Sequence, residues 1–392
     1  MRKDWEYKKL GEVCTIERGG SPRPITDFIT NDSNGINWIK IGDTKEGSKY
    51  ITSTKEKIKP EGVKKSRFVH KGDFILSNSM SFGRPYILDI DGCIHDGWLV
   101  IHDGKKFFSK DYLYYLLASP IMYSRFSQLA VGGVVNNLNS ALVRKVIVPI
   151  PPISIQLSIA NELDKINELI QLKKQQLEDY DQLAQSIFYE MFGDPVENEK
   201  GWEVKKLGEI CDIRDGTHDS PKYVEHSDYI LITSKNIENN LISFENVNYI
   251  TEEDFLRINK RSKVDDGDII MPMIGTIGNP IIVKLVNNIN FAIKNVALIK
   301  FYSTSSVINY YLQSLMKSSS FEKDITRFHK GGTQKFIALG TIRNFKIPLP
   351  PLPLQQQFAA RIEAIERQKQ QVSETIKDLE TLLASRMQYW FD

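Results

Sequence analysis

The chain carries the same sequence twice. The first copy reads WEYKKLGEVC at residues 5–14 and the second reads WEVKKLGEIC at 202–211. KGDFILSNSMSFGRP at 71–85 matches DGDIIMPMIGTIGNP at 266–280, and VPIPPISIQ at 148–156 matches IPLPPLPLQ at 347–355. The offset between matched residues stays between 195 and 199. The 392 residues therefore form two copies of a unit of about 197 residues, which is far longer than a solenoid or propeller repeat.

The first part of each unit has a mixed α and β pattern. Gly-Asp turns lead into apolar runs at 72–77 and 267–272, which predicts a strand in each copy. Further strands are expected over 36–41 and 229–233. Apolar residues at helical spacing predict helices over 111–119 and 307–316.

The second part of each unit is one long helix that follows a proline cluster. In the first copy we expect it to run from Ser154, as N-cap, to Phe192, with Gly193 just beyond its end. Such a helix of 39 residues is about 58 Å long. Apolar residues recur at spacings of four and three, the period of a coiled-coil seam, so each helix needs a partner and the other copy is the nearest one. The predicted seam residues are Leu163, Ile166, Leu177, Tyr180, Ile187, Ile362, Ile365, Ile376, Leu379 and Leu383.

Charge is unevenly distributed along the chain. Residues 1–152 contain 23 Lys and Arg against 16 Asp and Glu, whereas residues 153–200 contain 4 against 10. Residues 201–351 contain 19 against 17. The excess positive charge lies in the first part of each unit, mostly of the first unit, and this distribution permits a polyanionic partner.

The sequence contains none of the catalytic motifs that we sought. It has no phosphate-binding GxxxxGK[ST] loop, no GxGxxG after a strand, no methyltransferase NPP-aromatic tetrapeptide and no HExxH. The six histidines and three cysteines do not have the spacing of metal ligands, so we expect no metal and no disulfide framework. The N-terminus lacks a secretory apolar region, and no apolar run approaches the length of a membrane span. These features lead us to expect a binding protein of the cytoplasm.

Three pairs of loops carry residue types suited to nucleic acid. Glycine allows close backbone approach, Ser, Thr, Arg and Lys donate to phosphates and base edges, and Asn and Gln pair with adenine. An ordinary turn has a similar composition, so the role of each single residue stays open. The candidate DNA-binding residues are Arg18, Ser21, Arg23, Ser77, Ser79, Arg84, Asn136 and Asn137 in the first copy, and Arg214, Thr217, His218, Ser220, Lys222, Lys330, Thr333, Gln334 and Lys335 in the second.

The ordered set of motifs, present twice, resembles the specificity subunit of type I restriction–modification systems. The resemblance rests on the KKLGE opening, the Gly-Asp strand before a Gly/Pro turn, and the PIPP or PLPPLPLQQQ run into a long helix. It implies an α+β fold with two tandem α/β target recognition domains separated by two long antiparallel coiled-coil helices. The implied segments are recognition domains at 1–152 and 196–351 and spacer helices, the conserved regions of the family, at 153–195 and 352–392.

The resemblance also implies a function. Each recognition domain would read one half of a bipartite site in double-stranded DNA, and the chain itself would be non-catalytic and bind no cofactor. It would recruit two modification subunits that use S-adenosylmethionine, and often restriction subunits that use ATP and Mg²⁺. We expect the acidic helices to set the spacing and to dock the modification subunits.

Two other functions remain as alternatives. One is a methyltransferase or nuclease fused to recognition domains, and the other is a coiled-coil adaptor without a nucleic-acid role. Assay of the chain alone for methyl transfer tests the first, and binding to a DNA library tests the second.

Overall fold

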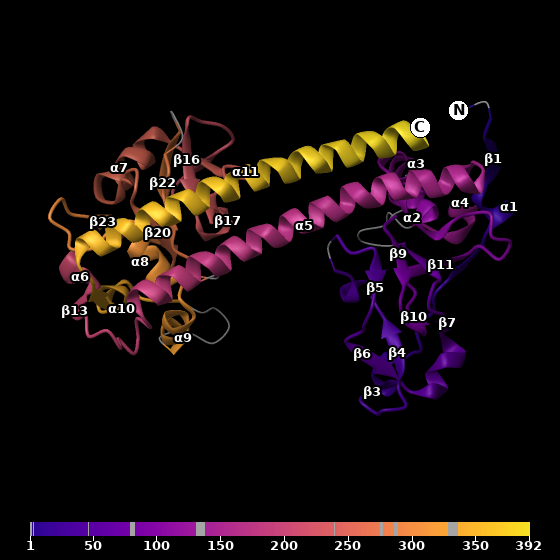
Figure 1. The fold of residues 1–392 in the computed structure, drawn as a ribbon, viewed down its shortest axis with the longest axis horizontal. Helices are drawn as coiled ribbons and strands as arrows, with labels where there is room; N and C mark the ends of the chain where they lie inside the picture. The colour runs from indigo at the N-terminus through magenta and orange to yellow at the C-terminus, as the bar shows by residue number, and fades with distance from the viewer. Residues whose placement is uncertain are drawn as a thin grey trace. The chain divides into compact units, whose positions relative to one another are not determined.

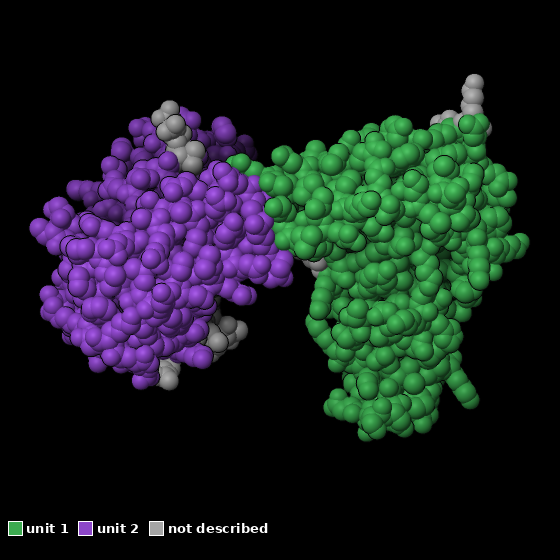
Figure 2. Space-filling model, in the orientation of Figure 1, with its two compact units in different colours: residues 1–174, 374–392 green, residues 175–373 purple. Residues whose placement is uncertain are grey.

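The computed structural model describes residues 2, 4–45, 47–78, 83–130, 138–238, 240–274, 277–285, 289–327 and 336–392. The chain packs as two compact units, coloured separately in Figure 2. Unit 1 comprises Met1–Lys174 and Glu374–Asp392, and unit 2 comprises Gln175–Ser373. The segments predicted from the sequence keep each long helix whole, whereas each packed unit contains part of both helices.

Unit 1 contains two five-stranded sheets and one two-stranded sheet, with strand orders β3-β6-β4-β10-β7, β2-β11-β8-β9-β5 and β1-β12. Its strands are β1 (Glu6–Lys9), β2 (Thr15–Arg18), β3 (Ile29–Thr30), β4 (Ile36–Ile39), β5 (Tyr50–Ile51), β6 (Glu56–Ile58), β7 (Arg67–Val69), β8 (Phe74–Ser77), β9 (Pro85–Leu88), β10 (Gly92–Ile94), β11 (Trp98–His102) and β12 (Ile147–Ile150). Its short helices are α1 (Leu10–Val13), α2 (Lys110–Ala118), α3 (Pro120–Ala130) and α4 (Ser140–Arg144), with 3-10 turns η1 (Ile25–Asp27), η2 (Ile41–Asp43) and η3 (Pro60–Lys65).

Unit 2 repeats this plan with sheets β14-β23-β20-β21, β15-β19-β16-β22, β13-β24 and the hairpin β17-β18. Its strands are β13 (Glu203–Lys206), β14 (Cys211–Asp215), β15 (Tyr223–Val224), β16 (Tyr229–Ile232), β17 (Ile237–Glu238), β18 (Leu241–Ile242), β19 (Asn248–Ile250), β20 (Ile269–Pro272), β21 (Ile281–Ile282), β22 (Asn290–Ile293), β23 (Val296–Phe301) and β24 (Lys346–Leu349). Its short helices are α6 (Leu207–Ile210), α7 (Glu252–Ser262), α8 (Asn309–Met316), α9 (Ser319–Arg327) and α10 (Leu339–Arg343), with the 3-10 turn η4 (Ser234–Asn236).

The KKLGE motif builds the same short helix in both units. In unit 1 the Glu12 carboxylate accepts a hydrogen bond from the backbone N–H of Lys9 at 3.1 Å, and Leu10 is fully buried. A Cβ on Gly11 would lie 2.7 Å from the Arg144 side chain, so glycine lets this arginine cross the helix. The second copy has the matching bond from Lys206 to Glu209 at 3.1 Å.

A buried glutamine joins the start of each long helix to the preceding domain. Gln156 is fully buried, and its amide donates to the carbonyls of Phe107 and Pro151, each at 2.9 Å. Its carbonyl oxygen accepts from the backbone N–H of Ser109 at 2.7 Å. Gln355 makes the same three kinds of contact in unit 2, so the Gln that follows the proline cluster has a structural role.

The two long helices are α5 (Ile153–Phe192) and α11 (Leu352–Phe391), each of 40 residues (Figure 1). Within unit 1, Arg386 donates a hydrogen bond to Glu162, and Lys174 forms an ion pair with Glu380 at 3.0 Å. The later residue of α5 therefore contacts the earlier residue of α11, so the two helices run antiparallel. Within unit 2, Asp181 bonds Lys369 at 2.6 Å. The antiparallel pairing implied by the resemblance is therefore confirmed, and charged residues that interrupt the apolar seam, such as Lys369 and Arg386, form ion pairs across it.

The ends of the elements differ in detail from the sequence expectations. The helix α5 begins at Ile153, so the expectation that Ser154 is its N-cap is wrong. The bonds from Ile155 and Gln156 to the Pro152 carbonyl already close the first turn. Gly193 has φ +75°, as expected for the residue that ends the helix. In the part of the chain that the structure describes, no helix has both the length and the apolar character that crossing a membrane requires.

Candidate nucleic-acid interface

In each unit, the loop that follows strand β2 or β14 is hydrogen-bonded to a facing loop. In unit 1 the N–H groups of Gly19 and Gly20 donate to the carbonyls of Trp98 and Ile94, at 2.9 and 3.1 Å. In unit 2 the N–H groups of Gly216 and Thr217 donate to the carbonyls of Val296 and Ile293, each at 3.0 Å. The main chain therefore holds both pairs of loops in the same way.

The first residue of each loop must be glycine because the facing backbone lies too close for a side chain. A Cβ on Gly19 would lie 2.1 Å from the carbonyl oxygen of His95, and one on Gly216 would lie 2.2 Å from that of Ile293. The RGG and RDG sequences thus encode a close backbone approach.

In unit 1, Asp96 organises the side chains of the paired loops. The Ser21 hydroxyl donates to its carboxylate at 2.8 Å, and the Arg23 guanidinium lies 3.5 Å away. The backbone carbonyl of Asp96 accepts from Arg18 at 3.0 Å and from Asn78 at 2.9 Å. The hydrogen bond from Ser21 holds the pKa of Asp96 below its usual value, so the carboxylate is charged at neutral pH. We call these five residues the Asp96 cluster.

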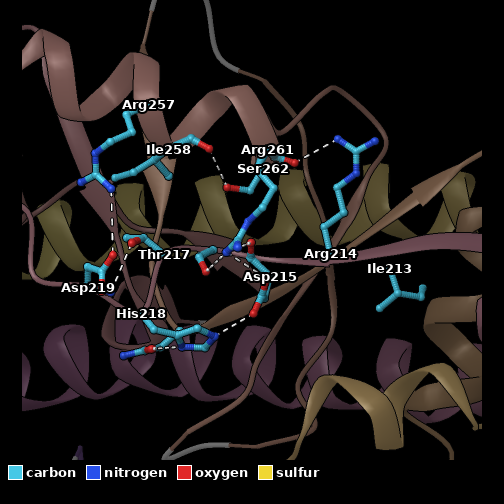
Figure 3. Close-up of polar contacts among 12 residues, drawn as sticks. Ile213, Arg214, Asp215, Thr217, His218, Asp219, Arg257, Ile258, Arg261 and Ser262 are labelled. Carbon is cyan, nitrogen blue, oxygen red and sulfur yellow. Dashed lines mark hydrogen bonds and ion pairs between the residues drawn. The ribbon is translucent and has the colours of Figure 1, made fainter.

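In unit 2, Asp215 organises the corresponding place (Figure 3). His218 Nε2 lies 2.7 Å from its carboxylate, and His218 Nδ1 lies 3.0 Å from Asn295 Oδ1. The Arg261 guanidinium, which comes from α7, is 3.1 Å from the same carboxylate and donates to the Gly216 carbonyl at 3.2 Å. We call Asp215, His218, Asn295 and Arg261 the Asp215 cluster.

The two clusters place acidic and basic residues differently on equivalent backbone positions, which are held by the hydrogen bonds between the paired loops. Arg18 and Asp215 occupy the same position, directly before the glycine that the facing backbone requires. The facing loop supplies the acidic Asp96 in unit 1 and the neutral Asn295 in unit 2. Equivalent positions in the two units therefore present different hydrogen-bond donors and acceptors.

The segment between strand β6 or β19 and the next Gly-Asp turn adds basic residues beside each loop. In unit 1 it is η3, where Lys64 and Lys65 are exposed, followed by Arg67, whose Nε donates to the Arg18 carbonyl at 3.1 Å. In unit 2 it is the longer helix α7, which carries exposed Arg257 and Arg261. None of these basic residues is among the DNA-binding candidates predicted from the sequence. The signal was present for α7, because Thr251 followed by three acidic residues is a helix N-terminal pattern.

A cavity of about 290 Å³ lies between α7 and the loop of unit 2. Its polar lining is visible in Figure 3, where Arg257 and Arg261 extend from one helix toward the loop. Hydrogen bonds from Arg257 and from the backbone N–H of Lys222 lower the pKa of Asp254. The bond from Lys222 also connects the N-terminal turn of α7 to the loop. The lining residues are Thr217, His218, Asp219, Arg257, Ile258, Arg261 and Ser262.

The remaining sequence candidates are placed differently. Ser77 is buried and its hydroxyl accepts from the backbone N–H of Arg84 at 3.0 Å, whereas the Arg84 side chain is exposed. Arg214 is bound to Asp212 at 2.6 Å, and Ser220 accepts from Lys294 at 3.0 Å. The predicted candidates that lie outside the described residues are Ser79, Asn136, Asn137, Lys330, Thr333, Gln334 and Lys335.

The predicted seam residues are buried or half-buried in every case. Leu163 joins the core of unit 1, and Ile362 and Ile365 join that of unit 2 together with Tyr180 and Ile187. Among the residues that the structure describes, no group of three or more His, Cys, Asp or Glu is arranged to hold a metal ion.

Comparison with known proteins gives consistent matches along the chain. The type I restriction enzyme MjaIX specificity subunit of Methanocaldococcus jannaschii is 26% identical over 389 residues, which cover 93% of this chain and 87% of the relative. The EcoBI specificity subunit of Escherichia coli is 21% identical, with 92% and 79% covered. A chain solved in work on complex assembly and conformational transition of the type I R-M system has the same fold, with a TM-score of 0.60, 20% identity, and 99% and 97% covered.

The family profile for the type I restriction modification DNA specificity domain matches twice, at residues 2–179 and 199–381. These two matches coincide with the two sequence copies and include both the Asp96 cluster and the Asp215 cluster. The chain belongs to the family of type I restriction modification DNA specificity domains and carries two copies of that domain.

Proposed function

We propose that this chain is the DNA-recognition subunit of a type I restriction–modification complex and is not itself an enzyme. The observation that carries the proposal is the pair of clusters, which place different side chains on one backbone frame within two copies of a DNA specificity domain. Each unit reads one half of a bipartite site in double-stranded DNA. The half-sites differ because the clusters differ.

The long helices have two roles in this proposal. They set the number of unread base pairs between the half-sites, and their exposed acidic faces bind modification subunits. Two modification subunits supply S-adenosylmethionine and methylate adenine, and restriction subunits supply the ATP- and Mg²⁺-dependent activity where they are present. The complex acts in the cytoplasm on the DNA of the cell.

A methylation map of DNA from cells that contain this chain and its modification subunits tests the proposal. We expect methylated adenines within a split motif of two short half-sites and a fixed gap. Omission of this chain should abolish that methylation. A single continuous motif, or methylation by this purified chain alone, would contradict the proposal and favour a fused methyltransferase.

A further inference from the structure

Helix α7 lies next to the loop after β14 and is the largest difference from unit 1 at this place. Phe255 and Ile258 pack on Leu231 and Ala292, so one face of the helix is fixed to the sheet. On the remaining surface, the exposed residues of the C-terminal half are Arg257, Lys260 and Arg261. At the same place unit 1 has only the six-residue turn η3. An α-helix fits the major groove of DNA, where each base pair presents a unique pattern of donors and acceptors.

Both arginines are held by carboxylates that are themselves mostly buried. Arg257 donates to Asp254 at 2.6 Å, and the Asp254 side chain is 16% exposed. Arg261 lies 3.1 Å from Asp215, whose side chain is 17% exposed. Arg257 uses Nη2 for Asp254, and its Nη1 lies 4.0 Å from Asp219, whereas the contacts of Arg261 all use Nη2. The Arg257 and Arg261 side chains are themselves 52% and 63% exposed. A guanidinium oriented in this way keeps other N–H groups for a ligand and loses little entropy on binding.

The charge around α7 favours base recognition over phosphate binding. Asp215, Asp219 and Asp254 lie beside the two arginines, so the local charge is close to balanced. These acids reduce the net positive charge on which phosphate binding depends. A bidentate contact from arginine to guanine depends on direction and hydrogen bonding, and it tolerates a neighbouring carboxylate.

We propose that Arg257 and Arg261 are specificity-determining residues of unit 2 and that each reads a guanine of the second half-site in the major groove. The proposal rests on the proposed function. The two residues are four apart on one helix face, about 6 Å, which suits bases one or two steps apart. Asp254 and Asp215 act as positioning residues for the two guanidinium groups.

The test uses the full chain with its modification subunits and S-adenosylmethionine, on duplex libraries with one half-site randomised at a time. The wild type should prefer guanine at two positions of the second half-site. Arg257→Lys and Arg261→Lys keep the charge but lose the planar guanidinium that makes two parallel hydrogen bonds. Each should therefore reduce the preference for guanine at one of these positions by about fivefold to a hundredfold. Preference in the first half-site should not change, which provides an internal control.

Lys260→Gln is the matched control, because it removes one charge from the same helix without removing an arginine. It should lower methylation of all sequences by a similar factor. Thermal unfolding of each variant checks that the helix remains folded, and Arg257→Gln and Arg261→Gln provide a second pair of substitutions. Wild-type behaviour of the lysine variants, or an equal loss at every sequence, would overturn the assignment. A wild type without split-site methylation would contradict the proposed function instead.

Discussion

The loops that follow β2 and β14 differ in their side chains, but these side chains occupy main-chain positions that the two units share. Ser21 contacts Asp96 in one unit, and His218 contacts Asn295 in the other, across the same pair of loops. Because backbone N–H and carbonyl groups hold the loops, the tips can differ without loss of these bonds. Under the proposed function, the main-chain atoms of these loops contribute stability and their side-chain atoms contribute recognition.

Alanine at either of the two close-approach glycines should destabilise its unit. Gly19→Ala or Gly216→Ala would place a methyl group about 2.1 or 2.2 Å from a facing carbonyl oxygen, and we expect a loss of about 2–4 kcal/mol. Gly42→Ala and Gly340→Ala are the controls, since a Cβ there meets no atom within 4 Å. Thermal unfolding of the full chain measures all four, and equal melting of test and control variants would contradict the packing argument.

Replacement of the buried glutamine should also be costly. Gln156→Leu would leave the Ser109 N–H and the Phe107 and Pro151 carbonyls without their partner, which should cost about 3 kcal/mol or more. Gln171→Leu, on an exposed position of the same helix, is the control. Denaturant unfolding compares the two, and a Gln156 variant as stable as the control would show that these bonds contribute little.

Some residues of the two clusters are predictable from the sequence and others are not, for physical reasons. Arg18, Ser21 and His218 could be selected because they follow a repeated motif directly. Asp96 and Arg261 could not, because each reaches the loop from a distant part of its unit, where the copies differ in length. His95, Asp96 and Gly97 in unit 1 face only Lys294 and Asn295 in unit 2.

At the scale of elements, the long helices were the most predictable part of the chain. The proline clusters and Gly193 indicated where they begin and end, and the spacing of apolar residues predicted the seam. The cationic residues that interrupt the seam, Lys369 and Arg386, form ion pairs. The three-dimensional position of α7 was not predictable, because it depends on contacts of Phe255 and Ile258 with two strands.

The Glu162–Arg386 pair should make the helix pairing of unit 1 sensitive to acid. The hydrogen bond from Arg386 lowers the pKa of Glu162, so the pair contributes stability above the usual pKa of glutamate, about 4.3. This contribution is lost as pH falls below that value through the lowered pKa of the folded state. We expect Glu162→Gln to reduce hydrogen-exchange protection of residues 374–391 at neutral pH by about two- to fivefold.

The same variant should show less change in protection upon acidification than the wild type. Glu168→Gln, exposed on the same helix, is the control and should retain the wild-type pH dependence. An unaltered acid response in Glu162→Gln would mean that this pair does not couple the two helices.

At the scale of the whole molecule, the uneven charge of the two copies should appear in the salt dependence of DNA binding. Residues 1–152 carry the larger positive excess, and Lys64 and Lys65 lie exposed beside the first loop. Lys64→Gln with Lys65→Gln should reduce the slope of log affinity against log salt by up to about 2. Lys260→Gln with Lys263→Gln in unit 2 should reduce this slope less. Equal reductions of the slope would contradict the larger contribution of unit 1 to salt-dependent binding.

The helices should determine the gap between half-sites. Four residues inserted in both α5 and α11 add about one turn, or about 6 Å, to each helix. The unread gap should therefore change by one or two base pairs while both half-sites stay the same, as a methylation map would detect. A gap that does not respond to the insertion would exclude the helices as its determinant.

The hydrogen-bonded loop frame has a consequence for how such a protein acquires new targets. Because the frame consists of peptide groups and one obligatory glycine in each unit, substitutions at the tips need no compensating change in the core. Under the proposed function, one half of the target can be altered by substitutions in one loop while the other half is kept. New combinations of half-sites would then arise through single substitutions, each of which leaves a folded protein.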